Sequence, residues 1–407
     1  MLIVGFIFGI IVIVFLMLPY YAKQALIYQS PGIEDYPIFE NRTVAAGVGQ
    51  EWPIDSLAGK IQPDNETLAK IESFEPVAFL VIKSGRIIYE KYWEDYGPES
   101  LSNSFSMAKS IVGLLVGAAI DDGYIKSIDQ PVADFIPVFR NEKNRDLKIK
   151  DVLTMSSGLN WDESYGTLFN TTTEAYYGKN IKEQIYGLEV IEKPGVKFNY
   201  LSGNTQLLAM IVEAATNRKI SEYASEKFWK PMGAVNDALW CLDDVTGMEK
   251  AFCCFNSNAR DFARWGKLVL NNGIWNGDTL ISPDYIQASV QPADLTDETG
   301  NKINYYGYQW WIHDANGWKV PYMRGILGQY VFVVPEENAV IVRLGHKRSD
   351  EKKNHHPVDS YLYLETAKKM LMDGLSTETI VKYTGLAKIE IKRLMQGTAI
   401  PLHENRL

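Results

Sequence analysis

The segment from Ser106 to Ile120 constrains the fold most, because it has helical spacing and is apolar almost all round. A helix without a polar face has to be buried among other elements, and Gly123 is a typical residue to follow its last turn. Lys109 is the only charged residue between Glu99 and Asp121. We therefore predict a central buried helix that carries one lysine in its first turn.

A second apolar segment lies at the N-terminus, where Leu2 to Leu18 contains no charged or polar side chain. Together with Tyr20 and Tyr21 it approaches the about 20 apolar residues that cross a bilayer. Lys23 follows at a position where a lysine reaches the membrane interface. A cleaved signal peptide is the alternative, but the apolar run is long for one, no basic region precedes it and no A-x-A site follows. We expect a single-pass transmembrane anchor over residues 1–21, with the rest of the chain on the periplasmic or extracellular side.

Strand patterns occur near both ends of the ordered chain, and helical patterns lie between them. The predicted strands are Val77–Ile82, Arg86–Tyr89, Tyr305–Ile312, Tyr330–Val334 and Val340–Leu344. Helical spacing dominates from Asp151 to about Trp240 and returns at Ala259–Leu270. This order predicts an α/β (α+β) fold in which helices flank an antiparallel sheet and an all-helical region is inserted at about 123–250. We expect one domain over 66–372, preceded by a stalk and lead-in over 22–65.

Residues 373–407 have the spacing of two short helices joined near Gly385, which is weakly similar to a helix-turn-helix. The whole chain carries a formal net charge of -9, whereas binding to a phosphate backbone needs an excess of lysine and arginine. Nucleic acid is therefore not an expected partner. We predict a small helical tail that packs on the domain or contacts a partner protein.

The three cysteines are too few for a disulfide framework. Cys253 and Cys254 are adjacent, and neighbouring cysteines form a bridge only with strain. They are predicted to pack as small apolar residues rather than to form a redox pair.

Ser106 and Lys109 lie three residues apart at the start of the buried helix, so their side chains share one face. A serine in a first helical turn is close to free backbone N–H groups and to the positive end of the helix dipole. Burial lowers the pKa of a lysine, which allows it to act as a base near neutral pH. Ser349 and Lys352 have the same spacing in a charged stretch, where the lysine stays solvated, so context distinguishes the two pairs. The alternative for Ser106 is a helix N-cap, with Lys109 on the surface.

With this pair, the sequence resembles the penicillin-recognising serine hydrolases, especially class C β-lactamase-like enzymes, related esterases and 6-aminohexanoate-dimer hydrolases. Three further segments match the family in order. They are Asp151–Leu159, Pro194–Ser202 with Tyr200 at the position of the catalytic tyrosine, and Gly325–Gln329 at the start of a strand. The resemblance spans about Val77 to Leu344 and implies a serine hydrolase of this fold.

The resemblance also implies roles for individual residues. Ser106 is the expected nucleophile, Lys109 and Tyr200 are the expected proton-transfer pair, and the N–H groups of Ser106 and Ile326 are the expected oxyanion hole. A tyrosine serves as a base only where an adjacent ammonium favours its anion, and Lys109 is the candidate. The expected substrate-binding residues are Ser202, Arg324, Gly325 and Gly328.

The chain departs from the family pattern at two positions of the third motif, where Met323 replaces a lysine or histidine and Arg324 replaces a small hydroxyl residue. Ser202 likewise replaces an asparagine that is common there. These changes argue against β-lactam turnover and favour a small amide or ester as substrate. A binding or sensor module that keeps the fold without turnover is the alternative.

Other chemistries have little support in the sequence. The five histidines occur without a G-x-S-x-G turn that would seat a Ser-His-Asp triad. H-E-x-x-H and C-x-x-C spacings are absent, so no metal site is expected. We expect no cofactor.

Overall fold

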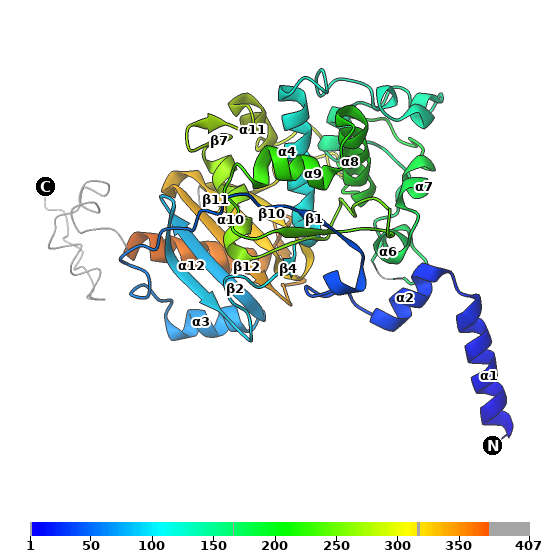
Figure 1. The fold of residues 1–407 in the computed structure, drawn as a ribbon, viewed down its shortest axis with the longest axis horizontal. Helices are drawn as coiled ribbons and strands as arrows, with labels where there is room; N and C mark the ends of the chain where they lie inside the picture. The colour runs from blue at the N-terminus through cyan, green and yellow to red at the C-terminus, as the bar shows by residue number, and fades with distance from the viewer. Residues whose placement is uncertain (1, 166, 316–317, 374–407) are drawn as a thin grey trace, which may run out of the picture.

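The computed structural model describes residues 2–165, 167–315 and 318–373, so the predicted tail over 373–407 lies outside the described residues apart from Asp373. Its centre is a six-stranded antiparallel sheet with the order β3-β2-β12-β11-β10-β9 (Figure 1). The strands are β2 (Pro76–Lys83), β3 (Arg86–Tyr92), β9 (Trp311–Ala315), β10 (Trp318–Arg324), β11 (Tyr330–Val334) and β12 (Ala339–Gly345). Leu80 of β2 is paired with Val342 of β12, so the sheet combines both ends of the chain, as predicted.

Alternating apolar side chains give this sheet two buried faces. Val331 and Val333 of β11 point to the core that contains α4 (Ala108–Asp121) and α10 (Ala259–Leu270). The intervening side chains of β11 point to a second core, which contains α3 (Asn65–Glu72) and α12 (Val358–Asp373). The sheet is therefore covered by helices on both faces.

The central helix predicted from its apolar sequence is α4, and its residues Ala108 to Ala119 are buried. It is preceded by one 3₁₀ turn, η2 (Phe105–Met107), so Ser106 lies just before the α-helix begins. A second helix, α8 (Ser202–Thr216), packs against α4 (Figure 1). The first turn of α4 and the start of α8 therefore belong to one packed unit.

The predicted helical insertion is less helical than expected, because long loops join its helices. It contains α5 (Ile149–Leu153), α6 (Thr171–Tyr177), α7 (Ile181–Tyr186), α8 and α9 (Ile220–Ala224). Its last part differs from the prediction, because Ala238–Cys241 forms strand β5 of a second sheet with the order β1-β5-β6-β4. The other strands of this sheet are β1 (Asn41–Val44), β4 (Ser102–Asn103) and β6 (Phe255–Ser257).

Residues 22–65 were expected to form a stalk and lead-in, and in the structure much of this segment lies on the domain. Strand β1 pairs with β5, with Asn41 opposite Cys241. Further along, the indole N–H of Trp52 donates a hydrogen bond to the carbonyl of Arg260, at 2.8 Å. These partners are about two hundred residues away in sequence, which is why local composition does not reveal them.

The N-terminal segment forms two helices, α1 (Leu2–Met17) and α2 (Tyr20–Tyr28), and α1 projects away from the rest of the molecule (Figure 1). Of the helices in the described part of the chain, none combines the length and apolarity required to span a membrane. The transmembrane anchor expected over residues 1–21 is therefore not supported. Its helix ends at Met17 after 16 residues, and Pro19 precedes the next helix.

Candidate active site

The turn before Ser106 is held by the small sheet. Ser104 and Phe255 are joined by two hydrogen bonds, one between backbones at 2.9 Å and one from the Phe255 N–H to the Ser104 hydroxyl at 3.2 Å. Phe105 has a φ of 43°, a left-handed conformation that is uncommon for a bulky residue. This sharp turn brings the partly exposed Ser106 to the N-terminal end of α4.

Lys109 lies directly behind Ser106. Its Nζ is 3.0 Å from the Ser106 Oγ and donates a second hydrogen bond to the carbonyl of Phe252, at 2.8 Å. The lysine is buried, and desolvation lowers its pKa from the usual value to about 8, although the negative charge of Glu163 opposes this shift. Ser106 and Lys109 therefore form the contact expected between a hydroxyl nucleophile and its base.

Tyr200 completes the group of three side chains predicted to act in catalysis. The Nζ of Lys109 lies 5.2 Å from the centre of the Tyr200 ring, and the Ser106 side chain is close enough to the Tyr200 hydroxyl to affect its pKa. Burial raises the pKa of Tyr200 above its ordinary value, and this outweighs the effects of Ser106, Arg324 and Arg348, which lower it. The phenol is therefore the stable form, which suits a proton donor better than the base considered from the sequence.

Ile326 lies in a tight loop at the end of β10. Among the described residues, we find no acceptor for the backbone N–H of Ser106 or of Ile326. The loop is compact because Leu327 and Gly328 both have positive φ values, of 59° and 86°. Two free N–H groups on adjacent segments are what an oxyanion hole requires.

Arg343 is a site-supporting residue that sequence analysis missed. It is fully buried in β12 and donates hydrogen bonds of 2.7 Å to the carbonyls of Leu327 and Gly328. Its other hydrogen bonds go to the carbonyls of Phe74 and Lys347 and to the hydroxyl of Tyr363. The sequence signal for Arg343 is a single charged residue within an apolar strand. A single charge within an apolar helix indicated Lys109 in the same way.

Ser202 and Glu163 lie together at the start of α8. Ser202 was predicted to bind substrate, and its hydroxyl donates to the Glu163 carboxylate at 2.7 Å. Sequence analysis missed Glu163, which comes from the loop before α6 and has no motif around it.

Arg324 was also predicted to bind substrate. Its guanidinium carbon lies 3.2 Å from the centre of the Trp311 ring, and Nη1 donates to the His355 carbonyl at 2.9 Å. It is not among the residues that line the cavity beside Ser106. Its neighbour Met323, at the position where the family has a cation, is buried. A direct contact between Arg324 and a substrate stays a prediction, as do those of Gly325 and Gly328.

A cavity of about 80 Å³ opens beside Ser106. Its wall includes Phe105, Tyr176, Ser202, Phe252, Cys253 and Ile326. No charged side chain of the described residues lines it. The site is therefore suited to an uncharged, largely apolar group next to the reacting carbonyl.

The prediction that Cys253 and Cys254 are separate apolar residues was wrong, because they form a disulfide with each other. Cys254 has a φ of 70°, so the backbone adopts an uncommon left-handed conformation at the bridge. Cys253 lines the cavity, and the preceding carbonyl, that of Phe252, holds Lys109. Cys241, the third cysteine, is buried and free.

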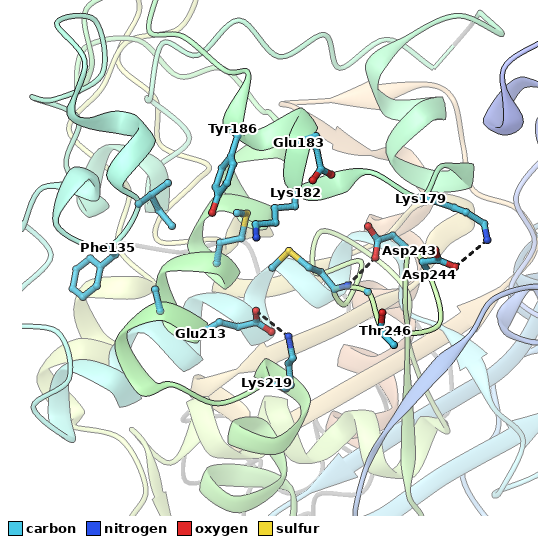
Figure 2. A pocket seen from close by; sticks show the side chains of 15 residues that line it. Phe135, Lys179, Lys182, Glu183, Tyr186, Glu213, Lys219, Asp243, Asp244 and Thr246 are labelled. Carbon is cyan, nitrogen blue, oxygen red and sulfur yellow. Dashed lines mark hydrogen bonds and ion pairs between the residues drawn. The ribbon is translucent and has the colours of Figure 1, made fainter.

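A larger cavity of about 530 Å³ lies elsewhere, between α7, α8 and the loop 243–248 (Figure 2). Lysines and acidic residues alternate around it, and Figure 2 shows Lys219 paired with Glu213 and Lys179 paired with Asp244. Its lining contains no serine or cysteine. The described residues also contain no group of three or more histidine, cysteine, aspartate or glutamate side chains arranged to hold a metal ion. Hydrolytic chemistry is therefore assigned to the smaller cavity.

Comparison with known proteins agrees with this geometry. The family model described as Beta-lactamase matches residues 66–362. The 6-aminohexanoate-dimer hydrolase of Paenarthrobacter ureafaciens is 26% identical over 333 residues, which cover 78% of this chain and 83% of that protein.

Solved structures show the same fold at low sequence identity. A protein from Bacillus anthracis, assigned provisionally as a 6-aminohexanoate-dimer hydrolase, has a TM-score of 0.69 and 21% identity, with 90% of this chain and 95% of that chain covered. A family VIII carboxylesterase has a TM-score of 0.61 and 15% identity, with 79% and 99% covered. Because the family model covers most of the chain and the Ser106–Lys109 contact is in place, this protein belongs to the beta-lactamase family of serine hydrolases.

Proposed function

We propose that this protein cleaves a small amide or ester through an acyl-enzyme on Ser106, with Lys109 as the base and Tyr200 as the proton donor. The observation that carries the proposal is the 3.0 Å contact between the Lys109 Nζ and the Ser106 Oγ. Burial lowers the pKa of Lys109 to about 8, so an appreciable fraction of the neutral amine is present near neutral pH.

In the acylation step, Lys109 takes the hydroxyl proton while the Ser106 Oγ bonds to the carbonyl carbon. The carbonyl oxygen becomes an oxyanion that accepts hydrogen bonds from the N–H groups of Ser106 and Ile326. The carbonyl then re-forms as the bond to the leaving amine or alcohol breaks, and Tyr200 gives this group a proton. The proton on Lys109 restores the phenol.

In the deacylation step, water loses a proton to Lys109 and attacks the acyl carbon. The bond between this carbon and the Ser106 Oγ breaks, and the oxygen recovers its proton from Lys109. The acid product leaves, and both catalytic side chains return to their starting states.

The cavity supports a substrate whose acyl group is uncharged. Its wall is formed by aromatic, hydroxyl and apolar side chains, and the cation of Arg324 is already engaged by Trp311 and the His355 carbonyl. A carboxylate adjacent to the reacting carbonyl would therefore lose its hydration without gaining an ion pair. This argues for linear amides and simple esters over β-lactams, in line with the names of the hydrolase and esterase relatives.

Labelling of the full chain with a fluorophosphonate, followed by peptide mapping, tests the proposal. Ser106 should be labelled, p-nitrophenyl esters and short linear amides should be hydrolysed, and Ser106→Ala should abolish both. Ser349→Ala is the matched control, since Ser349 belongs to the second S-x-x-K pattern. A folded protein without labelling or hydrolysis would refute the proposal, and an adduct that persists for hours would favour the alternative, a binding or sensor module without turnover.

We also propose that the chain associates with a membrane through α1 and that the catalytic domain is periplasmic or extracellular. Support comes from the side chains of α1, since Phe6 is 71% exposed and Leu16 is 65% exposed. Exposed apolar surface of this kind favours a lipid environment. Flotation of the full chain with vesicles, compared with Phe6→Asp, tests the association. A wild-type chain that does not float would contradict the association, and equal flotation of both proteins would contradict the role of α1.

A further inference from the structure

Glu163 makes an unusually complete set of contacts at the start of α8. Its Oε2 accepts hydrogen bonds from the Ser202 N–H at 2.6 Å and from the Trp161 indole N–H at 2.9 Å. Its Oε1 accepts from the Ser202 hydroxyl at 2.7 Å and from the Tyr165 hydroxyl. Four donors around one carboxylate fix the position of this group.

These contacts hold the turn that carries Tyr200. Ser202 is the first residue of α8, and Leu201 before it has no side chain that can cap the helix. The Glu163 carboxylate therefore satisfies a free N–H and places a negative charge at the positive end of the helix dipole. Met155 holds the same turn from the other side, because its carbonyl accepts from the Asn199 N–H at 2.7 Å. Tyr200 is thus positioned between Met155 and Glu163.

The charge of Glu163 also reaches both proton-transfer groups. It raises the pKa of Lys109 against the effect of burial, and it raises the pKa of Tyr200. The positive charges of Arg324 and Arg348 act on Tyr200 in the opposite direction. Burial and the charge of Tyr200 both raise the pKa of Tyr165 and of Tyr306, and the rings of Tyr200 and Tyr306 lie 6.0 Å apart.

We propose that Glu163 is a positioning residue of the catalytic centre, whose carboxylate fixes the Tyr200–Ser202 turn and supplies the negative charge that faces Lys109. The inference rests on the proposed function, because it assigns Glu163 a part in proton transfer at Ser106. Glu163 acts through Lys109 and Tyr200 and takes no part in bond formation. In its absence the base would lose its proton at lower pH, and the proton donor would be less precisely placed.

The test compares the pH dependence of kcat/KM for Glu163→Gln and Glu163→Asp in the full chain, with a p-nitrophenyl ester as substrate. The glutamine keeps the size and one acceptor but removes the charge, so the acidic limb should move to lower pH and kcat should fall about tenfold. The aspartate keeps the charge but withdraws it from Ser202, so kcat should fall while the acidic limb stays near that of the wild type. Both variants should remain labelled at Ser106.

Asp64→Asn is the matched control. Asp64 accepts from the N–H and the hydroxyl of Thr67 at 2.8 Å each and caps α3, on the other face of the sheet from α4. Asp64 caps a helix as Glu163 does but does not face Lys109. The pH profile of Asp64→Asn should therefore equal that of the wild type. The inference is overturned if Glu163→Gln leaves the acidic limb of the pH profile in place. It is also overturned if Asp64→Asn moves that limb by the same amount.

Thermal unfolding and Ser106 labelling separate the possible failures. If Glu163→Gln does not fold, Glu163→Asp decides: a lower kcat with an unmoved acidic limb supports the inference, and a moved limb overturns it. A wild type that neither labels nor hydrolyses overturns the proposed function and this inference with it. Normal labelling with identical pH profiles overturns the role of Glu163 alone.

Discussion

Gly325 packs so closely against Ser104 that a Cβ at position 325 would lie 2.4 Å from the Ser104 carbonyl oxygen. This contact joins the end of β10 to the turn before the nucleophile. The separation between the N–H groups of Ser106 and Ile326 therefore depends on a residue without a side chain.

Gly325→Ala is expected to push the Ile326 loop away from Ser106 and to weaken oxyanion binding. Loss of one oxyanion donor costs about 100-fold or more in kcat, so a decrease of this size is expected in ester hydrolysis. Gly97→Ala is the control, because a Cβ at Gly97 has no neighbour within 4 Å and φ is not positive there. Similar activity of the two variants would contradict this role.

The acidic limb of kcat/KM is expected near pH 8. The pKa of Lys109 is lowered to about 8, and the neutral amine is the active form, so the rate should rise about tenfold per pH unit below this value and level off above it. Lys109→Met should remove the limb along with nearly all activity. Lys352→Met, in the second S-x-x-K pattern, should keep the wild-type profile. A limb near pH 10 would show that burial does not lower the pKa of Lys109.

Tyr200→Phe is expected to affect amides more than activated esters. An amine leaving group needs a proton, whereas p-nitrophenolate leaves as an anion, so the loss should be about 100-fold or more for a linear amide and much smaller for the ester. The measurement is kcat/KM for both substrates at pH 8. Tyr306→Phe is the control, since the Tyr306 hydroxyl is buried and has no hydrogen-bond partner in the described structure. Equal losses for amide and ester would rule out Tyr200 as the proton donor.

Arg343→Met is expected to lower both stability and activity. The change leaves four carbonyl oxygens without their donor, including those of Leu327 and Gly328 beside Ile326. The free energy of unfolding should fall by about 3 kcal/mol, measured by urea denaturation, and kcat should fall in the fraction that remains folded. Arg86→Met removes an exposed arginine from the same sheet and should change stability by less than about 0.5 kcal/mol. Unchanged kcat in folded Arg343→Met would separate the arginine from the oxyanion loop.

Helices and strands were predicted correctly where the sequence has a clear periodic pattern of apolar residues. Ala259–Leu270 is a helix with the predicted bounds, and the hairpin at Arg86 and the buried helix of Lys109 were likewise predicted. The predicted strand at Tyr305–Ile312 was mostly wrong, since β9 begins only at Trp311. Gln309 within this segment has a φ of 63°, which is not a strand conformation. Its side-chain amide donates a hydrogen bond of 2.9 Å to the carbonyl of Leu153, which is 156 residues away in the sequence.

The residues of the candidate site also fall into a predictable and an unpredictable group. Ser106, Lys109 and Tyr200 lie in segments with a recognisable order, and the structure brings them together. The roles of Glu163 and Arg343 could not be predicted, because they depend on contacts with residues that are distant in the sequence. Neither a loop glutamate nor an arginine in a strand has a local pattern that reveals such partners.

The bridge between Cys253 and Cys254 joins residues that are already neighbours in the chain. A crosslink stabilises a protein mainly by restricting the conformations of the unfolded chain, and its effect grows with the length of the loop that it closes. A bridge between adjacent residues closes almost no loop. Loss of this bridge would therefore leave the unfolding equilibrium almost unchanged. The bridge therefore shapes the wall of the cavity beside Ser106, which Cys253 lines, and contributes little to the persistence of the fold.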